Sequence, residues 1–346
     1  MGQPDQGSRH QGAVNRDRDV PLGLHRALIA LVLAVCAHSL VHAEDSASAY
    51  PKGPVRLVIP FPPGGPTDSL GRILAQRLQE AWGQPVVSDY KPGAGTVIGI
   101  DAVAKSTPDG MTIGLVNSAY TINPVLLNAM PYDTLRDLTA VTQVVTMTMA
   151  LLAYQGTPFN TFPELLAYAR NHPATLSYAT PGAGGAAHLA GELLNRSAGI
   201  DLLHVPYKGS SPAQTDVMAG RVDLMFDPLF SALPLVRAGK LKVIALAAER
   251  PVAGFEQYSV INQTVSGVVV SAMLGLVVPA ATPPAIVQRI QSDVARALDP
   301  PAERRKIADL GMEVMASTPA EFDRFVRSEM QKWSRVIREA HIAPPQ

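Results

Sequence analysis

The segment Val55–Asp68, with the sequence VRLVIPFPPGGPTD, most constrains how the chain can fold. Its first five residues form a mostly apolar run that predicts a buried strand, and an amphipathic segment beginning at Thr67 predicts a helix. Between them, Gly64 and Gly65 can adopt positive φ, and the three prolines of Phe61–Asp68 fix φ and preorganise the loop. Because the helix directs unpaired N–H groups and its positive dipole end into this loop, the segment predicts an anion site that needs no charged side chain.

The same arrangement is repeated later in the chain. Leu176–Thr180 predicts a strand, Pro181–Gly185 is a glycine-rich loop, and His188 falls in the first turn of the helix that follows. We call Phe61–Asp68 the first glycine loop and Thr180–His188 the second. Neither has a dinucleotide fingerprint or the lysine of a phosphate-binding P-loop. A valine in place of Gly65 or Gly184 is expected to abolish binding, because its Cβ would fill the anion pocket.

Strands and helices alternate along the rest of the chain, which predicts mostly parallel sheets covered by helices on both faces. The pattern predicts a strand over Thr112–Asn117 and a helix over Pro284–Leu298, among others. Another glycine loop, Lys91–Gly95, precedes a short helix.

Two apolar segments, Val141–Tyr154 and Met273–Pro279, are predicted to cross between two domains. A capping box at Thr318–Glu321 begins a long helix with one apolar stripe, which we expect to pack back on the first domain. The expected fold is α/β, with two mostly parallel sheets flanked by helices and joined by two crossing strands. Residues 44–150 with 273–346 would form domain 1, and residues 151–272 would form domain 2, closing on ligand about a hinge.

The N-terminus carries the features of a secretory signal peptide over residues 1–43. An apolar run, Ala27–Ala37, follows a basic residue, and Val41 and Ala43 supply the small side chains of a cleavage site. The run is too short for a spanning helix, although a membrane anchor is the alternative. The single cysteine, Cys36, lies inside this segment, so the exported chain would depend on its core and not on disulfides.

Composition excludes several classes of protein. The 29 basic residues are balanced by 29 acidic residues, which gives no prior for nucleic-acid binding. The chain has no G-x-S-x-G elbow, and no carboxylate at recognisable spacing completes a catalytic triad or a metal site with His188 and His204. We therefore expect neither an enzyme nor a metal or cofactor protein. The alternative is an exported hydrolase or isomerase that uses His188 with Asp227.

Polar side chains follow several predicted strands at the carboxyl edge, where open α/β sheets bind ligands. Asp227 ends a buried strand there, and it could either accept a ligand group or hold backbone amides of a neighbouring loop. Tyr207 and Lys208 follow another strand at this edge, and Ser118 does so in the first domain.

The motifs YPKGPVRLVIPFPPGGPTD, KPGAGTVIGIDAVAKSTPDG, HVPYKGSSPA and GRVDLMFD resemble those of the Bug family. These are the periplasmic, TctC-like solute-binding receptors of tripartite tricarboxylate transporters, and the resemblance covers Tyr50–Ala343. It implies a monomeric Venus-flytrap fold that captures a small organic carboxylate (a di- or tricarboxylate, an amino acid or an aromatic acid). Its partners would be integral-membrane transporter subunits or a sensor protein.

In this family, backbone amides and hydroxyls of the two glycine loops hold the ligand carboxylate. The resemblance therefore assigns ligand binding to residues of both loops and of the adjacent strand ends: Phe61, Gly64, Gly65, Thr67, Asp68, Thr180, Gly182, Ala183, Gly184, Gly185, His188, Tyr207, Lys208 and Asp227. Ser118 joins this set from its position after a strand. Many relatives carry an aromatic pair where this chain has Met273-Leu274, so the resemblance does not specify which acid is bound.

Overall fold

The computed structural model of the chain describes residues 50–64, 66–182, 184–207, 209–252, 254–339 and 342. The predicted signal peptide lies outside these residues, as do Gly65, Ala183 and Lys208 of the predicted site. No helix in the described part of the chain combines the length and the apolar character that a membrane span requires.

One group of strands and helices, which we call the first lobe, contains the first glycine loop. Its parallel strands are β1 (Val55–Ile59), β2 (Val86–Tyr90) and β3 (Thr112–Asn117), in the order β2-β1-β3. The helices that follow these strands are α2 (Pro66–Trp82), α3 (Val97–Ala104, preceded by the 3-10 turn Ala94–Thr96) and α4 (Ala119–Leu126). Later in the chain come α10 (Pro284–Leu298), α11 (Pro301–Asp309) and β10 (Glu313–Val314).

The other group, the second lobe, contains the second glycine loop. Its strands are β5 (Ser177–Thr180), β6 (Leu203–Pro206), β7 (Leu224–Pro228) and β8 (Leu241–Leu246), and β5 pairs in parallel with both β6 and β7. Its helices are α5 (Phe162–Asn171), α6 (Ala186–Ala198), α7 (Ser210–Met218), α8 (Leu229–Arg237) and α9 (Ile261–Thr264). Each glycine loop thus lies between a parallel strand and the N-terminus of a helix, β1 and α2 in one lobe and β5 and α6 in the other.

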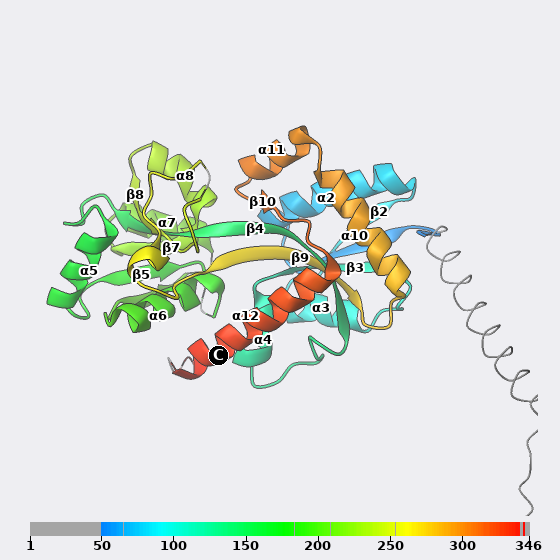
Figure 1. Ribbon diagram of the computed structural model, residues 1–346, viewed down its shortest axis with the longest axis horizontal. Coiled ribbons are helices and arrows are strands. Elements are labelled where there is room, and N and C mark those ends of the chain that lie inside the picture. Colours follow the sequence, from blue (N-terminus) through cyan, green and yellow to red (C-terminus); the bar gives the residue numbers. More distant parts are fainter. Residues whose placement is uncertain are drawn as a thin grey trace, which may run out of the picture. The chain divides into compact units, whose positions relative to one another are not determined.

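Two long strands link the lobes, as predicted. The first part of β4 (Leu138–Tyr154) pairs with β9 (Ser271–Pro279), and its last part pairs with β7 and β8. The sheet order is β2-β1-β3-β9-β4-β7-β5-β6, so β4 carries one sheet into the other (Figure 1). The outer strands are parallel as predicted, but the crossing strands pair antiparallel because the chain returns along β9, which makes the sheet mixed.

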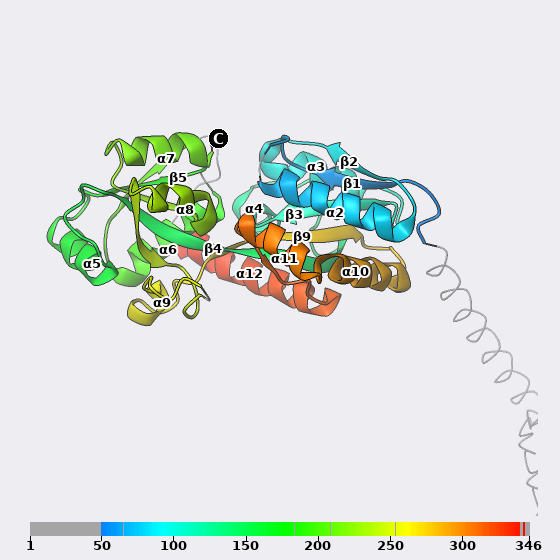
Figure 2. The same cartoon turned by 90° about the horizontal axis from the view of Figure 1, so that it is seen from above.

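The helix α12 (Pro319–Glu339) packs on the first lobe, as predicted, and also on the second lobe. Phe322 and Val326, near its start, lie in a core cluster with β9 and α3 residues. Trp333 and Val336, near its end, lie in the second-lobe core with residues of α6. A helix of 21 residues is about 32 Å long, and Figure 2 shows it extending below β4 from one lobe to the other.

Candidate functional site

A side chain of the helix that follows the first glycine loop accepts a hydrogen bond from the backbone of the loop. Asp68, in the first turn of α2, is fully buried, and its carboxylate accepts the Gly64 N–H at 2.8 Å and the Tyr90 hydroxyl at 2.6 Å. The same carboxylate forms an ion pair with Arg72, one turn further along α2. These partners, with the Tyr90 hydrogen bond the largest contribution, hold the pKa of Asp68 below its usual value.

The second glycine loop has the same kind of hydrogen bond. The Gly184 N–H donates to Nδ1 of His188 at 3.0 Å, and His188 lies in the first turn of α6. In both loops, therefore, a glycine at positive φ (103° for Gly64, 74° for Gly184) donates its N–H to a side chain four residues later. This shared hydrogen bond was not predicted, although the four-residue spacing of glycine and acceptor is visible in the sequence.

A second histidine supports the same loop. The rings of His188 and His204 are stacked, with centroids 3.9 Å apart and planes inclined by 14°. Nε2 of His204 lies 2.7 Å from the Thr180 hydroxyl, which in turn donates to the Gly182 carbonyl at 3.0 Å. The backbone of the second loop is thus held at Gly182 and at Gly184 through the two imidazoles.

Asp227 lies at the carboxyl end of β7 and is fully buried. Its carboxylate accepts hydrogen bonds from Ser210 at 2.7 Å, Gln214 at 2.8 Å and the hydroxyl of Ser231. Burial raises its pKa, because these donors are neutral and only partly offset desolvation. Of the two alternatives for Asp227, the geometry favours a structural one, but the groups that it holds are side chains of α7 and α8 and not backbone amides.

The other predicted residues differ in whether their side chains already have hydrogen-bond partners in the structure. The Ser118 hydroxyl oxygen accepts the Met273 N–H at 3.2 Å, and the Tyr207 hydroxyl donates to Asp216 at 2.8 Å. Phe61 packs at the edge of the first-lobe core. Thr67, Gly182 and Gly185 are half-buried, beside the loop turns.

The short helix α4, which the sequence analysis did not predict, lies close to two of the glycine loops. Asn123 donates from Nδ2 to the Gly95 carbonyl of the Lys91–Gly95 loop at 2.8 Å. Leu126, one turn later, lies so close to the second loop that a Cβ added to Gly184 would fall 2.6 Å from its Cδ2. Pro124 lies inside this helix. A proline in a segment argues against a helix, so the sequence pattern did not predict α4.

Asparagine substitutions separate the roles of the two buried carboxylates. Asp68→Asn is expected to lower the free energy of unfolding at pH 7 by about 1–3 kcal/mol, because it removes hydrogen bonds to a charged acceptor. Asp227→Asn is expected to cost much less, since burial already disfavours the charge of Asp227. Urea denaturation of both variants measures the difference, and an Asp227→Asn loss as large as that of Asp68→Asn would contradict it.

The two groups also have opposite linkage to pH. The pKa of Asp68 is lowered by folding, so its contribution is present above the ordinary value of about 3.9 and is lost as the pH falls below it. The pKa of Asp227 is raised, so its ionisation reduces stability as the pH rises above the ordinary value.

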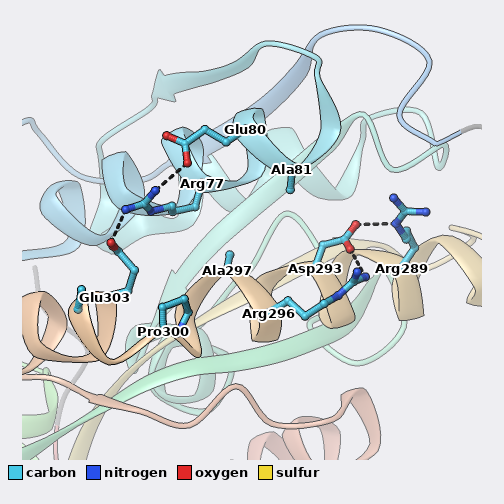
Figure 3. Close-up of a pocket in the computed structure, with 10 residues that line it drawn as sticks. Arg77, Glu80, Ala81, Arg289, Asp293, Arg296, Ala297, Pro300 and Glu303 are labelled. Carbon is cyan, nitrogen blue, oxygen red and sulfur yellow. Dashed lines mark hydrogen bonds and ion pairs between the residues drawn. The ribbon is translucent and has the colours of Figure 1, made fainter.

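A cavity of about 600 Å³ lies elsewhere in the first lobe, along α2, α10 and the start of α11 (Figure 3). Its charged side chains neutralise one another: Arg77 pairs with Glu80 and Glu303, while Asp293 pairs with the two arginines of α10. Among the described residues, no group of histidine, cysteine and acidic side chains could hold a metal ion.

Two α/β lobes that are joined by crossing strands, each with a glycine loop at a helix N-terminus, define the class of two-domain solute-binding proteins. The chain belongs to the family described as the tripartite tricarboxylate transporter family receptor (TctC), whose model matches residues 70–342. Protein BugT of Bordetella pertussis is 31% identical over 315 residues, covering 90% of this chain and 97% of BugT. These matches confirm the Bug and TctC resemblance.

Solved structures agree in fold. A Rhodopseudomonas palustris protein with adipate has a TM-score of 0.75 and 31% identity, covering 86% of this chain and 100% of its own. MatC from Rhodopseudomonas palustris, with bound malate, has a TM-score of 0.70 and 29% identity, covering 83% and 100%. Family and neighbours are binding proteins, not enzymes. The hydrogen bonds of His188 and Asp227, the pair in the enzyme alternative, also go to different groups.

Proposed function

We propose that this protein is a periplasmic receptor that holds a small dicarboxylate between its two glycine loops. The observation that carries the proposal is the repeated loop construction, in which Gly64–Asp68 and Gly184–His188 form matching turns at the N-termini of α2 and α6. Neighbours with adipate and malate support the ligand class.

The chemistry of the loops suits an anion. In each loop one glycine N–H is tied back internally, which fixes the turn and leaves the other N–H groups of the first helical turn available to a carboxylate. Both acidic side chains of the site, Asp68 and Asp227, are fully buried and hydrogen-bonded. Neither carboxylate is therefore exposed at the loop surface, the charge of Asp68 is paired with Arg72, and the groups offered to the ligand are amides and hydroxyls. We assign Phe61, Thr67, Gly182 and Gly185, whose side chains or amides lie at the loop turns, to this surface.

Capture would occur by closure of two domains, residues 44–150 with 273–346 against residues 151–272. The crossing strands β4 and β9 would serve as the hinge. The lobes touch where Leu126 lies against Gly184 and where Phe230 lies against Gly311. A change in lobe position would alter both contacts.

Its ligand would be delivered to membrane subunits of a tripartite transporter, which the family supports. The signal-peptide pattern of residues 1–43 supports export, as do neighbours that are periplasmic binding proteins, such as BugD.

A thermal-shift panel tests the proposal. The purified protein would be freed of retained ligand by unfolding and refolding, and then heated with adipate, malate, citrate, aspartate, glutamate and aromatic acids. A ligand present at 100 times its Kd adds about 2.7 kcal/mol to stability, which is a shift of several degrees. A shift with a dicarboxylate is expected. No shift with any acid would contradict the proposal.

A further inference from the structure

The two glycine loops are built alike, but their acceptors differ in one chemical property. In the first loop the Gly64 N–H is held by the carboxylate of Asp68, which the Arg72 and Tyr90 contacts keep ionised. In the second loop the Gly184 N–H is held by an imidazole nitrogen of His188. A carboxylate accepts throughout the neutral range, whereas imidazole Nδ1 accepts only while it carries no proton.

The hydrogen bonds define the tautomer of both rings. Nδ1 of His188 faces the Gly184 N–H and must be the unprotonated nitrogen, so its proton is on Nε2. Thr180 has one hydroxyl proton and donates it to the Gly182 carbonyl, so it must accept from Nε2–H of His204. A further proton on either ring places a positive charge in a stacked pair whose ring centroids are 3.9 Å apart.

Burial of this pair favours the neutral state, whereas a nearby carboxylate favours the charged state of His188. On α6, the carboxylate of Glu192 lies 3.7 Å from Nε2 of His188. On β5, the hydroxyl of Tyr178 donates to Glu192 at 2.7 Å. On α4, which reaches the loop through Leu126, the one titratable side chain is Tyr120, whose hydroxyl donates to the Thr134 carbonyl. Burial lowers the pKa of His188. Burial and the charge of protonated His188 together lower the pKa of His204 to about 4.

We propose that His188 and His204 are positioning residues, and that the second glycine loop keeps its ligand-binding shape only while the imidazole of His188 is neutral. Protonation of His188 at Nδ1 replaces the acceptor of the Gly184 N–H by a donor, and the turn opens. Protonation of His204 occurs at Nδ1 and leaves its Nε2–H bond to Thr180 in place, but it adds a charge to the stack that disfavours protonation of His188. This inference rests on the proposed function, and it adds that one half of the site responds to pH while the Asp68 half does not.

The direction of the effect follows from the lowered pKa values. Ligand affinity is expected to be constant above the ordinary histidine pKa of about 6.5 and to fall as the pH approaches 4. Loss of one neutral hydrogen bond that shapes the loop corresponds to about a tenfold weaker affinity.

Calorimetric titration with adipate between pH 7.5 and 4 tests the proposal in three proteins. His188→Asn keeps an acceptor, Oδ1, for the Gly184 N–H but cannot titrate. Between pH 7.5 and pH 4, the affinity of His188→Asn should fall about tenfold less than that of the unaltered protein. This holds whatever the affinity of the variant at pH 7.5. The matched control is His172→Asn, because His172 ends α5 and stacks on Tyr168, away from the loop. The carboxyl groups of adipate titrate alike in all three proteins, so their contribution cancels in the comparison.

A second variant provides a signature that a purely structural role would not produce. Glu192 raises the pKa of His188, so Glu192→Gln should move the midpoint of the affinity loss to lower pH. An equal loss of affinity in the unaltered protein and His188→Asn, or an unmoved midpoint in Glu192→Gln, would overturn the proposal.

NMR spectra of the ligand-free protein distinguish this failure from a failure of the proposed function. We expect the Nε2–H tautomer at His188 and a Gly184 amide signal that titrates with the His188 midpoint, below pH 6.5. A protein that binds no acid but shows these signals would refute the receptor proposal while keeping the histidine arrangement. An Nδ1–H tautomer at His188, or a Gly184 amide that does not titrate, would refute the histidine proposal even if adipate binds.

Discussion

Gly184→Val is expected to weaken dicarboxylate binding by at least tenfold while leaving the protein folded. Gly184 has a φ of 74°, a region that costs an L-residue about 1–2 kcal/mol. Its new Cβ would also lie 2.6 Å from Cδ2 of Leu126. The Leu126 side chain can shift, but the backbone strain is relieved only if the turn moves, which breaks the Gly184–His188 hydrogen bond. Isothermal titration with adipate or another bound acid measures the loss.

A control for backbone strain lies at the other end of the same helix. Gly199 ends α6 at a φ of 61°, and a Cβ there would meet no described heavy atom within 4 Å. Gly199→Val should therefore destabilise the protein through its backbone alone and keep its affinity. Equal affinity in the Gly184 and Gly199 variants would argue against a role of the second loop in binding. The sequence analysis attributes the Gly184 effect to filling of an anion pocket, but the structure assigns it to φ and Leu126.

Trp333→Ala is expected to lower the free energy of unfolding by about 3–5 kcal/mol, the usual range for truncating a buried tryptophan. Trp333 is fully buried near the end of α12, in the second-lobe core. It contributes to the packing of a helix whose beginning belongs to the first-lobe core, so its loss should weaken the connection between the lobes. Denaturant unfolding at pH 7 measures the change.

Trp333→Phe serves as the companion variant. The indole N–H of Trp333 is buried and has no hydrogen-bond partner among the described residues. Phenylalanine removes this unsatisfied donor and keeps much of the apolar volume, so its cost should be well below that of alanine. If both variants lost the same stability, packing of the ring would not be the source of the tryptophan's contribution.

Elements encoded by local pattern were predicted well. The strand Thr112–Asn117 and the helix Pro284–Leu298 have the predicted bounds, because apolar periodicity and flanking prolines act over a few neighbouring residues. The capping box predicted at Thr318–Glu321 is also present, with the Thr318 hydroxyl accepting the Glu321 N–H. Elements without such a pattern were not predicted, among them α4, which contains a proline, and the strongly polar α11.

For the candidate site, the sequence by itself determined which segments could form it. A strand, a glycine loop and a helix N-terminus are local features, and even the ties from Gly64 to Asp68 and from Gly184 to His188 span only four residues. Only the tertiary structure decided what these segments meet. His204 stacks on His188 from another strand, Leu126 reaches Gly184 from the other lobe, and α12 joins both cores. Such contacts depend on the pairing of distant strands, which no local pattern of residues specifies.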